Sequence, residues 1–167
     1  MKKKHVAKKI ERKDTSVKAR EWLERGQSSE DPIEKLTNMW RGFNNLYHVD
    51  TAGPEIDKIN QYLINNISEE FARDLIDNHA EETEYLLSEP VIDMRGNGRD
   101  TSLSIEEYRQ TEISEMKLRA LFKIIYQIRC NLEHGQKSPT RERDIELCKA
   151  AWPFLAETVA DSIDRSE

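Results

Sequence analysis

One short stretch near the C-terminal end of the chain holds three side chains suited to phosphate chemistry: Arg129, Asn131 and His134. Histidine transfers protons near neutral pH because its ordinary pKa is about 6.5. An arginine fork stays charged and donates two parallel hydrogen bonds to a phosphate, and asparagine can orient either partner. This set suits metal-free RNA cleavage, in which the 2′-OH attacks the adjacent phosphate and leaves a 2′,3′-cyclic phosphate and a 5′-OH.

The same three residues also have an ordinary structural interpretation. A histidine before a terminal glycine stabilises the C-terminal end of a helix through the helix dipole. An arginine at the edge of an apolar stripe pairs with a core carboxylate, and Asn131 can satisfy end-of-helix carbonyl groups. Residue types alone favour this interpretation over a nuclease site.

A long helix must carry these side chains. Helix formers dominate from about Glu112, and Gly135 is a suitable C-terminal cap. Apolar residues recur in steps of three and four, at Leu118, Leu121, Ile125, Ile128 and Leu132. At about 100° per residue, Asn131 and His134 share a face, and Arg129 lies roughly 140° away from His134. Either the helix loosens before Gly135, or the arginine reaches around, or two chains complete one site across a two-fold axis.

Start signals and periodicity predict an all-α bundle around this helix. A short helix is expected over 16–26, and four later helices begin at start signals or caps, which are Asp31-Pro32, Pro54, Ser68 and Thr140. From Val91 to about Thr111 the periodicity fails, which predicts irregular structure. The segments 112–134 and 140–164 are expected to form an antiparallel hairpin, and Pro153 is expected to kink the last helix.

Composition is typical of one soluble, mostly helical protein, with 35% charged and 37% hydrophobic residues among 167. Nine Lys or Arg against two acids give residues 1–20 a net charge of +7, so the remainder carries −6 − 7 = −13. We therefore divide the chain into a basic arm with a short helix over 1–29 and a helical domain over 30–167. The arm either holds a phosphate backbone or is a solvated tail.

No apolar run is long enough for a membrane span or a secretory signal, so no membrane partner is expected. Cys130 and Cys148 lack metal-ligand spacing and are interpreted as reduced thiols of a cytoplasmic protein. His79 with its neighbouring acids also lacks such spacing, so neither a metal nor a cofactor is expected.

Two arginines and two glycines share the loop 94–100. Such a loop can turn backbone amides toward a phosphate or be a plain exposed turn. Arg95, Arg99 and, in the next linker, Lys137 are the candidate RNA-binding residues. Trp40, Phe43 and Tyr47 could stack on bases, but their one-face spacing favours the core.

The stretch 126–137 resembles HEPN domains, whose mark is an arginine, four to six residues and then a histidine at the end of a bundle helix. Here four residues separate Arg129 from His134. The longer run 128–138 looks like Apea-like and related bacterial HEPN proteins, and 40–47 looks like their early helix. Glu133 is a departure, because similar proteins often have an aromatic or apolar residue there and an acid repels RNA.

The resemblance implies a HEPN-like helical bundle and a homodimer in which two motifs meet in a cleft. For active members it implies metal-independent RNA cleavage, here with Arg129, Asn131 and His134 as the catalytic residues. It also implies a setting in antiphage or toxin–antitoxin defence, with an antitoxin or other regulatory protein as partner. The alternatives are a catalytically silent HEPN module that binds nucleotide or a partner protein, and an assembly subunit whose motif only pins the dimer.

Overall fold

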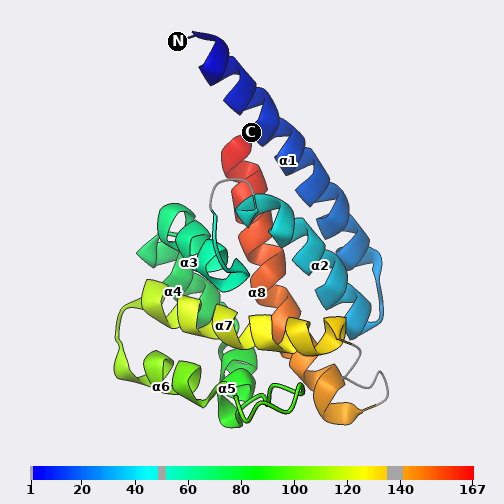
Figure 1. Cartoon of the computed structure of the whole chain (residues 1–167), viewed down its shortest axis with the longest axis vertical. Helices are drawn as coiled ribbons and strands as arrows, with labels where there is room; N and C mark the ends of the chain where they lie inside the picture. The colour runs from blue at the N-terminus through cyan, green and yellow to red at the C-terminus, as the bar shows by residue number, and fades with distance from the viewer. Residues whose placement is uncertain (1, 49–51, 135–140) are drawn as a thin grey trace.

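The computed structural model describes residues 2–48, 52–134 and 141–167, with side chains from residue 14 onward. Within these ranges the chain forms eight α-helices. The only β-structure there is a single bridge between Ile92 and Asp100, in the segment between α5 and α6, so the predicted all-α class is confirmed (Figure 1). The helices are α1 (Lys2–Ser28), α2 (Pro32–Tyr47), α3 (Glu55–Asn66), α4 (Glu69–Asn78), α5 (Ala80–Ser88), α6 (Ser102–Gln110), α7 (Ser114–Glu133) and α8 (Glu142–Ser166).

The first helix is longer than the sequence predicts. Its backbone is helical from Lys2 instead of Ser16, because no glycine or proline interrupts the helix formers before Gly26. The first turns of α1 project beyond the other helices (Figure 1). The later turns pack on the body: Ala19 and Leu23 are buried in the same core as the other helices. A Cβ built on Gly42 of α2 would lie 3.1 Å from the Ala19 carbonyl oxygen, so glycine permits the close approach of α1 and α2.

The start signals of α2 and α4 work as predicted. The Asp31 side chain accepts hydrogen bonds from the backbone N–H groups of Ile33 (2.7 Å) and Glu34 (3.2 Å). Ser68 accepts one from the Phe71 N–H at 3.1 Å. Each cap satisfies amides that have no partner within the helix.

One helix, α6, falls where the sequence predicts irregular structure. Of its nine residues only Tyr108 is buried, so it carries too little apolar periodicity to be recognised.

The last helix lies at the centre of the bundle. Its buried residues occupy most of its circumference, and it packs against α1, α2 and α5. The predicted antiparallel hairpin of 112–134 and 140–164 is wrong: α7 runs across α8 instead of alongside it (Figure 1). A helix that is apolar on nearly every side needs several neighbours, and one antiparallel partner would cover only one stripe. The helix continues through Pro153, which is buried. The predicted caps Gly135 and Thr140 lie outside the described residues.

Among the helices described, none combines the length and apolar composition needed to cross a bilayer.

Candidate functional site

The Arg129–His134 motif lies at the C-terminal end of α7, close to where α2 begins (Figure 1). The helix is regular through Glu133. His134 caps it with φ −82° and ψ 6°, and its N–H donates to the Cys130 carbonyl at 3.1 Å. The helix therefore does not loosen before His134, and the first of the three arrangements that could unite the motif is not found.

Arg129 is held by two carboxylates and an aromatic ring. Its Nη1 lies 3.1 Å from Glu55 Oε2, and its Nη2 donates to Glu133 Oε1 at 3.0 Å. Its guanidinium carbon lies 5.4 Å from the centre of the Trp40 ring. The Arg129 side chain is 21% exposed, so its charge needs such partners. The structural interpretation predicts an ion pair with a core carboxylate; the partner that the structure shows, Glu55, is 30% exposed.

Glu55, at the first turn of α3, ties three helices together. Its Oε1 accepts a hydrogen bond from the Tyr47 hydroxyl of α2 at 2.6 Å, and its Oε2 accepts one from the Tyr126 hydroxyl of α7 at 3.4 Å. Burial, and then the neighbouring Glu55, raise the pKa of Tyr47 well above its usual range, so the phenol remains a hydrogen-bond donor. Sequence reasoning misses Glu55 because it lies 74 residues from Arg129 and no local pattern joins them.

Asn131 lies on the other side of α7. It is 1% exposed, its Nδ2 donates to the Ile92 carbonyl at 2.8 Å, and its Oδ1 accepts from the Met94 N–H at 3.2 Å. Gln127 also donates to this oxygen, at 3.0 Å. The Asn131 side chain therefore fastens the loop after α5 to α7, and satisfies neither end-of-helix carbonyl groups nor Arg129.

That loop is organised around the buried Asp93. Its carboxylate accepts hydrogen bonds from Arg95 (Nη2 to Oδ2, 2.7 Å) and from Asn97 (Nδ2 to Oδ2, 2.9 Å). These hydrogen bonds, with Arg95 the largest cause, hold the pKa of Asp93 well below its usual range. Gly96 and Gly98 have φ values of 77° and 74°, which explains the glycines at these positions.

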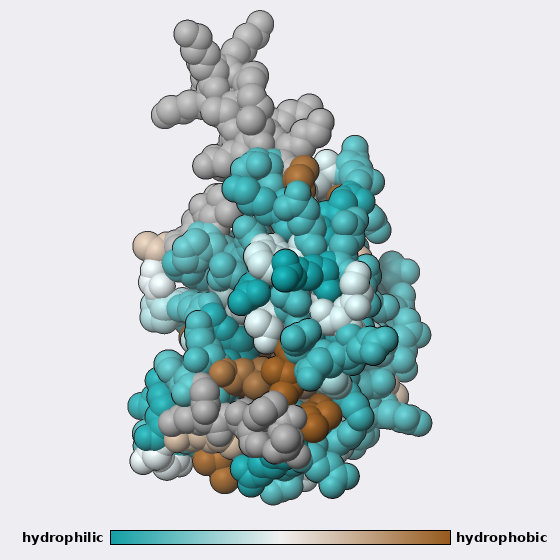
Figure 2. Space-filling model, turned by 90° about the vertical axis from the view of Figure 1, so that its right-hand side faces the viewer, coloured by the Kyte–Doolittle hydropathy of each residue, from teal (hydrophilic) through white to brown (hydrophobic). Residues whose placement is uncertain are grey.

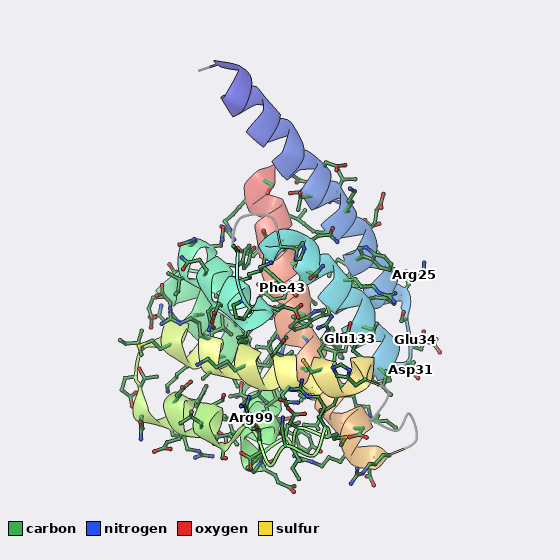
Figure 3. The ribbon with its side chains drawn as sticks, viewed as in Figure 1. Arg25, Asp31, Glu34, Phe43, Arg99 and Glu133 are labelled. Carbon is green, nitrogen blue, oxygen red and sulfur yellow. The ribbon has the colours of Figure 1, made fainter. Side chains whose placement is uncertain are left out.

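The candidate RNA-binding residues are therefore not brought to Arg129. Arg95 is neutralised by Asp93, and Lys137 lies outside the described residues. Arg99 is exposed, but Figure 3 shows it on the opposite side of α7 from Glu133, which pairs with Arg129.

His134 has an exposed side chain. Because Arg129 turns toward α2 and Asn131 toward the loop, the described residues of one chain do not unite the three predicted catalytic residues. Neither helix loosening nor a long reach of Arg129 joins them, and completion by a second chain stays a prediction.

A pocket of about 340 Å³ lies between the first half of α2 and the end of α7. Its apolar floor is made by Ile33, Leu36, Trp40 and Leu132, and its polar rim by Thr37, Arg41, Arg129 and Glu133. Figure 2 shows this side of the molecule, where a small apolar patch interrupts a mostly hydrophilic surface. Sequence analysis does not single out Arg41, although the run 40–47 that contains it carries part of the HEPN resemblance.

The three aromatic residues of α2 belong to the core, as their spacing predicts. Trp40, Phe43 and Tyr47 are 3%, 0% and 3% exposed, so together they form no open stacking surface; of the three, Trp40 also lines the α2–α7 pocket.

His79 has a structural contact in place of metal ligands. Its Nε2 lies 2.5 Å from Glu157 Oε2, which joins the junction of α4 and α5 to α8. In the part of the chain that the structure describes, no group of three His, Cys, Asp or Glu residues could hold a metal ion.

Comparison of the chain with family models, with curated proteins and with solved structures finds no match. The HEPN resemblance therefore stays a prediction.

Proposed function

We propose that this protein is a metal-independent endoribonuclease that uses the α2–α7 pocket together with His134. One observation supports it above the others: Arg41 and Arg129 border an apolar floor at the end of the helix that carries the exposed His134. Guanidinium groups bind phosphate, an apolar floor accepts a nucleobase, and imidazole transfers protons.

The reaction needs two proton transfers. The RNA 2′-oxygen forms a bond to phosphorus while the bond from phosphorus to the 5′-oxygen breaks. One imidazole takes the 2′-OH proton, and a second, protonated imidazole gives a proton to the leaving 5′-oxygen. Two copies of the chain in a homodimer would supply one His134 each, and Arg129 would stabilise the charge on the phosphate.

Asn131 has a different role in this proposal from the one the HEPN resemblance implies. Its amide is already used by the loop 92–94 and by Gln127, and its side chain is buried. We therefore assign it as a positioning residue. A setting in antiphage or toxin–antitoxin defence, with an antitoxin partner, rests on the resemblance alone.

A second candidate function is a catalytically silent module that binds nucleotide or a protein. The observation that favours it is the pairing of Arg129 with both Glu55 and Glu133, since an arginine with two carboxylate partners is less available to RNA phosphate.

A cleavage assay separates the two functions. Wild type and His134→Ala are purified in parallel and incubated with a mixed RNA pool in excess EDTA. The nuclease predicts cleavage by wild type with cyclic-phosphate ends, and a loss of at least about 100-fold in His134→Ala. Equal cleavage by both would indicate a contaminant or another site. Intact RNA with both proteins would favour the binding module.

A further inference from the structure

Two arginines on neighbouring helices share one tryptophan ring beside the α2–α7 pocket. The guanidinium carbon of Arg41, on α2, lies 4.9 Å from the centre of the Trp22 ring of α1, and that of Arg25 lies 5.9 Å from it. Arg41 Nη1 also donates to Asn38 Oδ1 at 3.3 Å. A weak attraction between each cation and the ring favours these side-chain positions over others.

The charges of these two arginines are not neutralised within the described residues. Neither Arg25 nor Arg41 has an acidic partner within ion-pair distance there, and both side chains are exposed. Several other arginines do have a carboxylate partner, namely Arg20, Arg95, Arg129, Arg143 and Arg165. Arg25 and Arg41 therefore present positive charge to solvent beside one ring.

Arg41 connects this pair to the pocket. It contacts Trp22 and also lines the pocket rim together with Arg129. Two guanidinium groups without a carboxylate partner in the described residues thus lead from the end of α1 to the pocket rim on α2, and the rim continues on α7 with Arg129, which pairs with Glu55 and Glu133. Figure 3 shows Arg25 on α1 and Glu133 on α7, on the two sides of α2.

We propose that Arg25 and Arg41, ordered by Trp22, form a phosphate clamp that leads single-stranded RNA into the α2–α7 pocket; the proposal rests on the proposed function. A guanidinium attracted to a ring through its face still has N–H groups in its plane to donate to phosphate oxygens. The ordering reduces the side-chain entropy lost on binding. Single-stranded RNA fits because only an unpaired base can enter an apolar pocket.

The test measures binding and not cleavage. A fluorescent 2′-O-methyl oligouridylate of about 12 nucleotides, which has no free 2′-OH to react, is titrated with the full chain and followed by anisotropy at several salt concentrations. Arg25→Gln and Arg41→Gln are each expected to weaken binding. Each should also reduce the slope of log K against log salt by about 0.7, the value for one lost phosphate contact on a single strand.

Two further variants make the assignment specific. Arg109→Gln removes the same charge from α6, remote from α1 (Figure 1), and is expected to bind like wild type. Trp22→Leu keeps both charges but removes the ring, so affinity should fall while the salt slope stays near the wild-type value. Thermal unfolding checks that each variant is folded. Should Arg41→Gln unfold, the exposed Arg25→Gln carries the test alone.

The outcomes separate this proposal from the nuclease. If wild type does not bind the RNA, the proposed function fails together with the clamp. If wild type binds but the Arg25 and Arg41 variants have its affinity and slope, the clamp is overturned and the nuclease stands. Equally tight binding of a duplex of the same length would overturn the preference for single strands.

Discussion

If Arg129 binds RNA phosphate as proposed, Glu133 competes with that phosphate for the guanidinium. It is half exposed and pairs with Arg129 from the next turn of α7, whereas Glu55 holds the same guanidinium from the side of α3. A ligand can displace an exposed carboxylate more easily than one that is also bonded to Tyr47, because less structure must rearrange. In the proposed nuclease Glu133 would therefore moderate RNA affinity, whereas Glu55 holds Arg129 and Tyr47 in place.

Removing the Glu133 charge should strengthen RNA binding. An exposed ion pair contributes about 0.2–1 kcal/mol, so Glu133→Gln is expected to lower the Kd for the 2′-O-methyl oligonucleotide by about 1.4- to 5-fold. Glu146→Gln on α8 is the matched control, because it removes another partly exposed acid from a local ion pair. An affinity equal to or below that of wild type would contradict the competition.

Removing the Glu55 charge should destabilise the fold. Glu55→Gln weakens the acceptor for Tyr47 and takes one carboxylate from the half-buried Arg129. Because Glu55 is 30% exposed, the full cost of breaking a buried ion pair does not apply, and a loss of roughly 1–3 kcal/mol in the free energy of unfolding is expected. Urea unfolding measures it. A change below about 0.5 kcal/mol would show that the three helices do not depend on this contact.

Asp93 should make stability depend on pH in acid. The pKa of Asp93 in the folded protein lies below its unfolded value of about 3.9. Its ionised carboxylate therefore contributes to the free energy of unfolding above about pH 3.9, and this contribution is lost as the pH falls below that value. In urea unfolding from pH 6 to pH 3, the stability difference between wild type and Asp93→Asn should therefore shrink below about pH 4. Asp164→Asn, an exposed acid on α8, serves as control. A difference that stays constant over this range would contradict the assignment.

At the scale of single helices, α7 separates two of the predicted catalytic residues. Residues two positions apart on a helix point about 200° apart, so Arg129 faces α2 while Asn131 faces the loop after α5. One helix thereby supports both the pocket wall and the loop that carries Arg99.

Asn131→Leu tests its role as a positioning residue. The leucine fills a similar volume but leaves the Ile92 carbonyl and the Met94 N–H without their hydrogen-bond partner. The free energy of unfolding is therefore expected to fall by roughly 2–4 kcal/mol. Hydrogen exchange at the Met94 amide should become faster, with the free energy of opening at that amide lowered by the same amount. A stable variant with normal Met94 protection and no RNA cleavage would instead make Asn131 a catalytic residue.

Local sequence patterns explain most helices and few of the contacts between them. The helices α2 and α7 follow from apolar periodicity, helped by the Asp31 cap, because these signals lie within a few residues of each other. The helix α6 does not, since it buries so little. Contacts such as Arg129 with Glu55, and the choice of α2 instead of α7 as the main partner of α8, depend on how distant segments meet. A pattern within one sequence does not predict which distant segments come into contact.

For the whole molecule, the described residues of one chain do not unite Arg129 with His134, so the proposed nuclease calls for a second copy. If the composite site takes its base from the His134 of one copy and its acid from the His134 of the other, a mixed dimer of wild type and His134→Ala lacks one of the two groups. Adding His134→Ala to wild type should then lower cleavage of the RNA pool in EDTA in step with the fraction of mixed dimers. Verified mixed dimers that keep half of the wild-type activity would contradict this division of the site.

The central place of α8 also has a consequence for synthesis on the ribosome. The helices α1 and α2 emerge early, yet the apolar faces they present are covered by α8, and the Tyr62 hydroxyl of α3 meets its acceptor, Ser162 Oγ, 100 residues later. Until α8 has emerged, the nascent chain keeps an apolar surface that chaperones can bind and that favours aggregation. The wall of the α2–α7 pocket therefore reaches its final support only when translation of this region is nearly complete.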